Sequence, residues 1–176
     1  ASAGNTRTET PDPVGMVSHR GPWVMTVASS THDEQPFGLG LSVVDGPVEL
    51  QNIQTQSGST TPAYNGPAVE ILRDPSNDEG CDPFSANYFA GKAALIQRGT
   101  CAFTIKIQNA YDAGAELVLI RNNQVGTISM DTTGAPSVPA YSMLQVDGDA
   151  LAAFIDNNPG TEVGFTQARP PGDRLS

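Results

Sequence analysis

Two cysteines, Cys81 and Cys101, are the residues of this chain best suited to form a covalent cross-link. An even count in an acidic, lysine-poor chain is compatible with one disulfide in an oxidising compartment, and two buried free thiols are the alternative. A bridge would close a loop of about 20 residues, which loop entropy values at roughly 3 kcal/mol. Zinc is not expected, because neither His19 nor His32 lies near a cysteine in the sequence.

An acidic run precedes the first cysteine and contains Asp74, Asp78 and Asp82. Calcium binds six to eight oxygen ligands, and carboxylate-rich loops supply them. The spacing is not that of an EF-hand, so a solvated acidic loop is the alternative interpretation. We therefore expect no cofactor and keep these three aspartates as weak calcium candidates.

Nucleophilic catalysis needs a nucleophile beside a base, and the sequence offers no such pair. It contains no Gly-x-Ser-x-Gly motif. His32 precedes Asp33, but adjacent residues rarely point at the same place, and His19 lies in a turn-like segment. We expect that this chain is not an enzyme by itself.

The segment after residue 91 has the most regular pattern. Residues 92–97 and 116–120 are predicted strands, and Gly114 ends a helix between them. The apolar face of that helix is formed by Phe103, Ile107, Ala110 and Tyr111. A strand, a helix and a strand within about 30 residues predict a right-handed βαβ unit with parallel strands.

Three polar residues follow these two strands: Arg98 after the first, and Arg121 and Asn122 after the second. Parallel strands end at one edge of a sheet, where open α/β folds place their binding clefts. Arg98 can meet a peptide carboxylate or backbone there. The alternative for Arg98 is an ion pair that fixes the turn at the strand end.

The rest of the chain supplies shorter elements. Strands are predicted over 23–28, 40–44, 48–52, 68–72 and 161–167. A further helix is predicted to start with Asp147 as its N-cap and to carry Leu151, Phe154 and Ile155 on one face. The 18 glycines and 14 prolines are typical of a chain with many turns.

Composition narrows the classes of function. The 176 residues hold 9 Lys and Arg against 19 Asp and Glu, a net charge of −10, and the pI is near 4.3. Such a surface repels phosphate backbones and anionic lipids, so nucleic-acid and membrane partners are not expected. The apolar runs are much shorter than the roughly 20 residues of a membrane helix. The chain starts Ala1-Ser2 without an initiator Met, which suggests a mature product or an excised piece.

The run GKAALIQRGTCAF, residues 91–103, strongly resembles the protease-associated (PA) domain. The resemblance continues through Lys106, Asn109-Ala110, residues 113–115 and Asn122-Asn123, and later through residues 137–140, 146–148 and Leu151. It implies an α/β (α+β) fold, with an open β-barrel-like sheet, flanking helices and a βαβ unit. It also implies a disulfide at Cys101.

A second resemblance concerns the beginning of the chain. Residues 22–33, PWVMTVASSTHD, look like a core strand in the catalytic domain of secreted subtilisin-like serine proteases, just before an inserted PA domain. Residues 1–5 are similar to the motif that supplies the oxyanion-hole asparagine of these enzymes. Asn5 would be that donor in the intact parent only, and a turn residue or frayed end is the alternative.

These resemblances predict four segments. They are a catalytic-domain piece (1–34), a connecting region (35–60), the PA domain (61–167) and a returning linker (168–176). The expected function is that of a non-catalytic PA domain of a secreted subtilisin-like endopeptidase. It would mediate protein–protein interaction, position substrate or control access to the active site. Its expected partners are a protein or peptide substrate and the parent catalytic domain. The alternatives are a calcium-dependent binding module and a stand-alone hydrolase.

Overall fold

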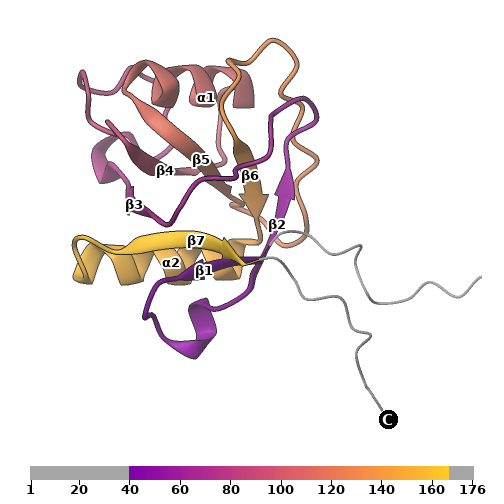
Figure 1. Cartoon of the computed structure of the whole chain (residues 1–176). Coiled ribbons are helices and arrows are strands. Elements are labelled where there is room, and N and C mark those ends of the chain that lie inside the picture. Colours follow the sequence, from indigo (N-terminus) through magenta and orange to yellow (C-terminus); the bar gives the residue numbers. More distant parts are fainter. Residues whose placement is uncertain (1–39, 167–176) are drawn as a thin grey trace, which may run out of the picture. The chain divides into compact units, whose positions relative to one another are not determined.

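The computed structural model describes residues 40–166 of the chain (Figure 1). Its elements are β1 Gly40–Val43, η2 Val48–Leu50, β2 Ile53–Ser57, β3 Val69–Leu72, η3 Pro75–Asn77, β4 Lys92–Gln97, α1 Phe103–Asp112, β5 Ala115–Arg121, β6 Ala140–Met143, α2 Gln145–Asn157 and β7 Glu162–Thr166. Several predictions lie outside the described residues: Asn5, His19, His32, the strand over 23–28 and the linker 168–176.

The strands form a closed barrel in the order β1-β2-β6-β5-β4-β3-β7. The four strands β3, β4, β5 and β6 are mutually parallel, and the remaining pairings are antiparallel. The predicted α/β fold class with a barrel-like sheet is confirmed. The sheet is closed rather than open, because Val163 of β7 pairs with Val43 of β1 and with Val69 of β3.

The central strands β4 and β5 are buried on both faces, as their continuous apolar runs predict. Leu95 and Leu119 pack into one core cluster together with Leu151 of α2. Ile96 and Ile120, one residue further along each strand, pack into a second cluster with residues of α1. Successive side chains of a strand point to opposite faces, so one βαβ unit supplies both cores.

The helix α1 confirms most of its predicted pattern. Ile107 and Ala110 are fully buried, and Gly114 follows the helix with a φ of +89°. Tyr111 was expected on the apolar face but is 49% exposed. The buried stripe is rotated toward Lys106 and Ala113, which leaves Tyr111 at its margin.

The predicted strand over 48–52 is wrong, since Val48–Leu50 is a 3-10 helix and the strand begins at Ile53. Asn52 has a left-handed φ of 58°, which interrupts an extended chain. The side chain of Gln51 also donates hydrogen bonds to the carbonyl oxygens of Val43 (2.8 Å) and Gly46 (3.1 Å). These contacts hold the segment as a compact turn.

The β6–α2 region also departs from the prediction. The strand β6 was not predicted, although it is buried throughout and pairs with both β5 and β2. The helix α2 begins at Gln145 after Leu144, whereas Asp147 was expected as its N-cap. Asp147 instead lies in the first turn, where its negative charge suits the helix dipole.

Candidate functional site

Four parallel strands end at one edge of the barrel, and the residues that follow them therefore meet there. Arg73 follows β3, Arg98 follows β4, Arg121 ends β5 and Leu144 follows β6. The loop that follows β5 and the first turn of α2, which follows β6, lie at the same edge. We refer to this place as the carboxyl edge.

A line of ion pairs crosses the carboxyl edge. Asp149 of α2 binds Arg121, Arg121 also binds Asp78, and Asp78 binds Arg73 at 3.1 Å. Arg73 in turn binds Asp156 at 2.6 Å, and this hydrogen bond lowers the pKa of the Asp156 carboxyl. Three carboxylates alternate with two guanidinium groups, so the line carries one excess negative charge.

Arg121 holds the centre of this line and is almost entirely buried, with 9% of its side chain exposed. Two of its nitrogens are engaged by Asp78 and Asp149, and its Nε has no partner within the described part of the chain. A Cβ atom at Gly148 would stand 2.2 Å from the Cβ of Arg121, so α2 packs directly on this side chain. Through these two ion pairs Arg121 links α2 to the loop that follows β3.

Asn122 is also buried, and its side chain fixes two neighbours. Its Oδ1 accepts a hydrogen bond from Nη1 of Arg98 at 3.1 Å, and its Nδ2 donates to the carbonyl of Gly126 at 2.7 Å. Arg98 is half-buried and forms no ion pair among residues 40–166. Of the three predicted binding residues, Arg98 alone keeps both exposure and an uncompensated charge, and its contact with a peptide stays a prediction.

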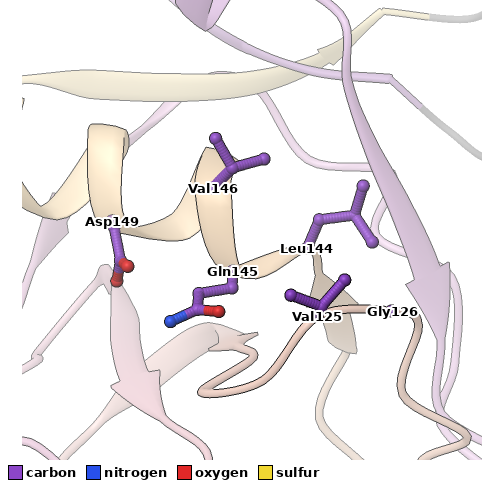
Figure 2. A pocket seen from close by; sticks show the side chains of 6 residues that line it. All are labelled: Val125, Gly126, Leu144, Gln145, Val146 and Asp149. Carbon is purple, nitrogen blue, oxygen red and sulfur yellow. The ribbon is translucent and has the colours of Figure 1, made fainter.

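A pocket of about 370 Å³ opens beside this line of ion pairs. It is lined by Val125 and Gly126 of the loop after β5 and by Leu144, Gln145, Val146 and Asp149 at the start of α2 (Figure 2). Val125 is 99% exposed and Val146 is 70% exposed, so two aliphatic side chains stand in solvent at the wall of one pocket. Gln145 and Asp149 leave α2 on the same side (Figure 2).

The acidic loop that follows β3 serves the fold. Asp74 caps η3 by accepting hydrogen bonds from the backbone N–H and the hydroxyl of Ser76. Asp78 forms ion pairs with Arg73 and Arg121. The side chain of Asn77 forms hydrogen bonds with the backbone of Asp82. Between residues 40 and 166, no three His, Cys, Asp or Glu side chains gather as a metal site. The calcium alternative therefore gains no support from this loop.

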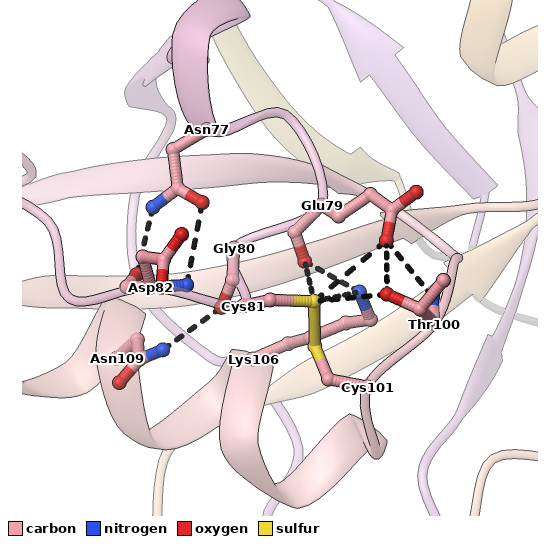
Figure 3. The surroundings of a disulfide bond; sticks show 9 residues. All are labelled: Asn77, Glu79, Gly80, Cys81, Asp82, Thr100, Cys101, Lys106 and Asn109. Carbon is pink, nitrogen blue, oxygen red and sulfur yellow. Dashed lines mark hydrogen bonds between the residues drawn. A yellow bond between two sulfur atoms is a disulfide. The ribbon is translucent and has the colours of Figure 1, made fainter.

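Cys81 and Cys101 form a disulfide, as predicted, which joins the acidic loop to the start of α1 (Figure 3). Lys106 of α1 is fully buried beneath it, donates to the carbonyl of Glu79 and lies 3.7 Å from Sγ of Cys81. Burial lowers the pKa of the Lys106 ammonium. The Glu79 carboxylate accepts hydrogen bonds from the N–H and the hydroxyl of Thr100, which lower its pKa.

Sequence reasoning missed the pocket at the carboxyl edge. Its two visible signals are a valine in the otherwise polar run NNQVG, residues 122–126, and a second valine directly after Gln145. Neither identifies a pocket alone, because single exposed apolar residues are common. The pairing of β5 with β6 brings the two segments together, and β6 was not predicted.

Residues 40–166 form a closed mixed barrel with two helices and an edge pocket, which defines this part of the chain as a small α/β module. The sequence pattern of the PA domain matches residues 64–151, half of the chain, and the chain belongs to the PA domain family. The first expected resemblance is thereby confirmed.

Several related proteins are named as proteases or peptidase-like proteins, and another is "RING finger protein 150" of Mus musculus, 24% identical over 81% of this chain and 35% of that protein. "Signal peptide peptidase-like 3" of Arabidopsis thaliana is 31% identical over 145 residues, covering 76% of this chain and 26% of the plant protein. "Minor extracellular protease Vpr" of Bacillus subtilis is 36% identical over 93 residues, covering 53% of this chain and 11% of Vpr. This chain thus spans only a fraction of each relative.

Solved structures share the fold. An aminopeptidase from Aneurinibacillus sp. strain AM-1 aligns with a TM-score of 0.58 and 24% identity, over 76% of this chain and 31% of that enzyme. At this level of identity the similarity shows the fold alone. Neither helix in residues 40–166 is long and apolar enough to cross a bilayer.

Proposed function

We propose that this chain is a non-catalytic interaction module of a secreted protease, which contacts protein or peptide segments near a catalytic domain. The observation that carries the proposal is the PA family match over residues 64–151 together with relatives that are named as proteases. The pocket at the carboxyl edge gives this module a place for such a contact.

The non-catalytic part of the proposal is supported by the side chains of the described region. Residues 40–166 contain no histidine. The two lysines of this region bind a carboxylate and a backbone carbonyl, Lys92 at Glu70 and Lys106 at Glu79. A nucleophilic hydroxyl would need a base within hydrogen-bond reach, and neither lysine meets a serine or threonine hydroxyl. The hydroxyls of Ser76 and Thr100 do meet the carboxylates of Asp74 and Glu79, but hydrogen bonds lower the pKa of both carboxyls and so make them weak bases.

The parent enzyme is the finer part of the proposal. We infer a subtilisin-like serine protease from the resemblance of residues 1–5 and 22–33 to its catalytic domain. The division at residues 34, 60 and 167 belongs to the same proposal, and Asn5 would act only in the intact parent. Secretion is supported by the disulfide, which persists in oxidising compartments.

The test is to incubate the purified 176-residue chain with fluorogenic peptide and ester substrates. We expect no turnover above buffer, and we expect retention of the chain on immobilised, reduced and carboxymethylated protein. A hydrolytic activity that copurifies with the chain and survives Asn5→Ala would contradict the proposal. The same variant should leave retention unchanged.

A further inference from the structure

Resting on the proposed function, we propose that the pocket at the carboxyl edge binds an extended peptide segment in which an aliphatic side chain stands next to a lysine or arginine. The pocket occupies about 370 Å³. Ligand pockets span roughly 300–1,000 Å³, so this one suits a single side chain and its backbone rather than a larger group.

The apolar part of the proposal comes from Val125, Leu144 and Val146, which line the pocket from two segments. Val125 and Val146 are both largely exposed, and both border the same cavity. An aliphatic side chain placed between them would remove all three surfaces from water. This arrangement selects an apolar side chain over a polar one.

The backbone part comes from Gln145. Its amide lies in the pocket and forms no hydrogen bond with any residue between 40 and 166 (Figure 2). A side-chain amide carries both a donor and an acceptor, which matches the C=O and N–H groups of an extended peptide. Gln145 can therefore hold the peptide backbone while the apolar side chain enters the pocket.

The charge part comes from Asp149. One of its oxygens binds Arg121, half of its side chain is exposed, and it ends a line of three carboxylates and two guanidinium groups. Its second oxygen can accept a hydrogen bond from a cation. Residues 40–166 hold fourteen Asp and Glu but five Lys and Arg, so the surrounding field also favours a basic partner.

Two features would favour an acidic peptide instead, and both are weaker at this pocket. The N-terminus of α2 attracts negative charge, but the carboxylates of Asp147 and Asp149 in its first two turns already supply that charge. Arg98 carries an uncompensated charge, but it follows β4, while the pocket lies between the ends of β5 and β6. Arg98 is linked to Gly126 of the pocket wall through Asn122 but does not itself line the pocket, so a carboxylate on Arg98 would lie beside the pocket rather than in it.

The experiment titrates the ¹⁵N-labelled 176-residue chain with three blocked tetrapeptides, Gly-Leu-Lys-Gly, Gly-Ala-Lys-Gly and Gly-Leu-Glu-Gly. We expect the Leu-Lys peptide to shift amides of residues 122–126 and 144–149. The Ala-Lys and Leu-Glu peptides should each bind at least about fivefold more weakly. Raising the salt concentration should weaken the Leu-Lys complex, because the cation and Asp149 meet near the surface.

Two variants locate the contact. Val146→Ser should weaken Leu-Lys binding by at least about fivefold, and it removes a side chain that is 70% exposed. Val48→Ser is the matched control, since Val48 is 78% exposed on a different turn, and it should bind like the unmodified chain. Melting temperatures of both variants that equal that of the unmodified chain show that the fold is intact.

Three outcomes overturn the inference: no peptide binds, Val146→Ser binds like Val48→Ser, or Leu-Glu binds as tightly as Leu-Lys. If the chain is still retained on immobilised carboxymethylated protein in those cases, the proposed interaction module stands and only the pocket's partner is wrong. Leu-Glu binding that is lost in Arg98→Gln would move the site to Arg98. Cleavage of a peptide would instead contradict the proposed function itself.

Discussion

Lys106 carries a charged ammonium group in a fully buried position. Burial of an ammonium without compensation is costly. Desolvation lowers its pKa, while the charges of Glu79 and Asp78 offset part of this effect. Its hydrogen bond to the Glu79 carbonyl fixes the loop beside the disulfide (Figure 3).

The first prediction concerns the pH dependence that Lys106 introduces. Because its pKa is lower in the folded chain than the ordinary 10.5, the unfolded chain binds more protons between these two values. The stability of the unmodified chain should therefore rise, relative to Lys106→Met, as pH increases toward 10.5. Urea unfolding of both proteins at several pH values measures this difference, and a difference that falls with pH would contradict the assignment.

At the residue scale, the sequence allowed the disulfide and the positions of Arg98, Arg121 and Asn122 to be predicted. It did not reveal that Arg121 and Asn122 are buried. Their burial comes from α2, which packs on Arg121, and from the loop that Asn122 closes at Gly126. A motif at a strand end does not indicate either contact, because each depends on how a later segment of the chain packs.

The helix α2 is positioned by its close approach to β5. Gly148 allows this approach, because any Cβ atom there would stand 2.2 Å from the Cβ of Arg121. The same helix places Gln145 and Asp149 in the pocket. Gly148 therefore links the packing of an element to the geometry of the candidate site.

The second prediction is that Gly148→Ala destabilises the chain. Helix propensity alone would favour alanine by about 1 kcal/mol, but the steric overlap should outweigh it and give a net loss of about 1–3 kcal/mol. Urea unfolding measures the change. Ala153→Gly, at an exposed position of α2, is the control and should cost about 1 kcal/mol. A stabilised Gly148→Ala protein would show that α2 is free to move away from Arg121.

At the element scale, continuous apolar runs made β4 and β5 predictable, and helical periodicity did the same for α1 and the buried face of α2. The turn over 48–52 was misjudged because its valine and leucine favour a strand, whereas Asn52 and Gln51 impose a turn. The strand β6 has four residues between a proline and α2, too short for its periodicity to stand out.

The molecule as a whole is strongly acidic, and several of its carboxylates accept hydrogen bonds that lower their pKa. They are Asp74, Glu79, Asp131 and Asp156. Burial raises the pKa of Asp147, which works in the opposite direction. We expect the four groups with a lowered pKa to set the sign of the response to acid.

The third prediction follows from this balance. A carboxyl whose pKa is lowered in the folded chain stabilises the fold fully when the pH is above its ordinary pKa near 4. This stabilisation is lost as the pH falls through the pKa of the folded chain. The melting temperature should therefore stay level from neutral pH to about 5 and fall below about 4. Asp156→Asn should make the fall shallower, because it removes the carboxylate that Arg73 binds. A melting temperature that rises in acid would contradict the sign.

At the scale of the whole molecule, the spaced PA motifs between residues 91 and 151 were enough to predict the family and the fold class. It did not predict barrel closure or the pocket, because both depend on strand pairings between distant segments. The strands β1 and β2 also complete the barrel from the stretch assigned to a connecting region, and the boundary at residue 61 stays a prediction.

The most direct test of the account is one NMR titration of the 176-residue chain with Gly-Leu-Lys-Gly, in which the peptide's own signals are followed with those of the protein. We predict that amides of residues 122–126 and 144–149 shift while the peptide remains intact throughout the experiment. A cleaved peptide would contradict the non-catalytic assignment. An intact peptide with shifts confined to other residues, or with none, would contradict the pocket as the place of contact.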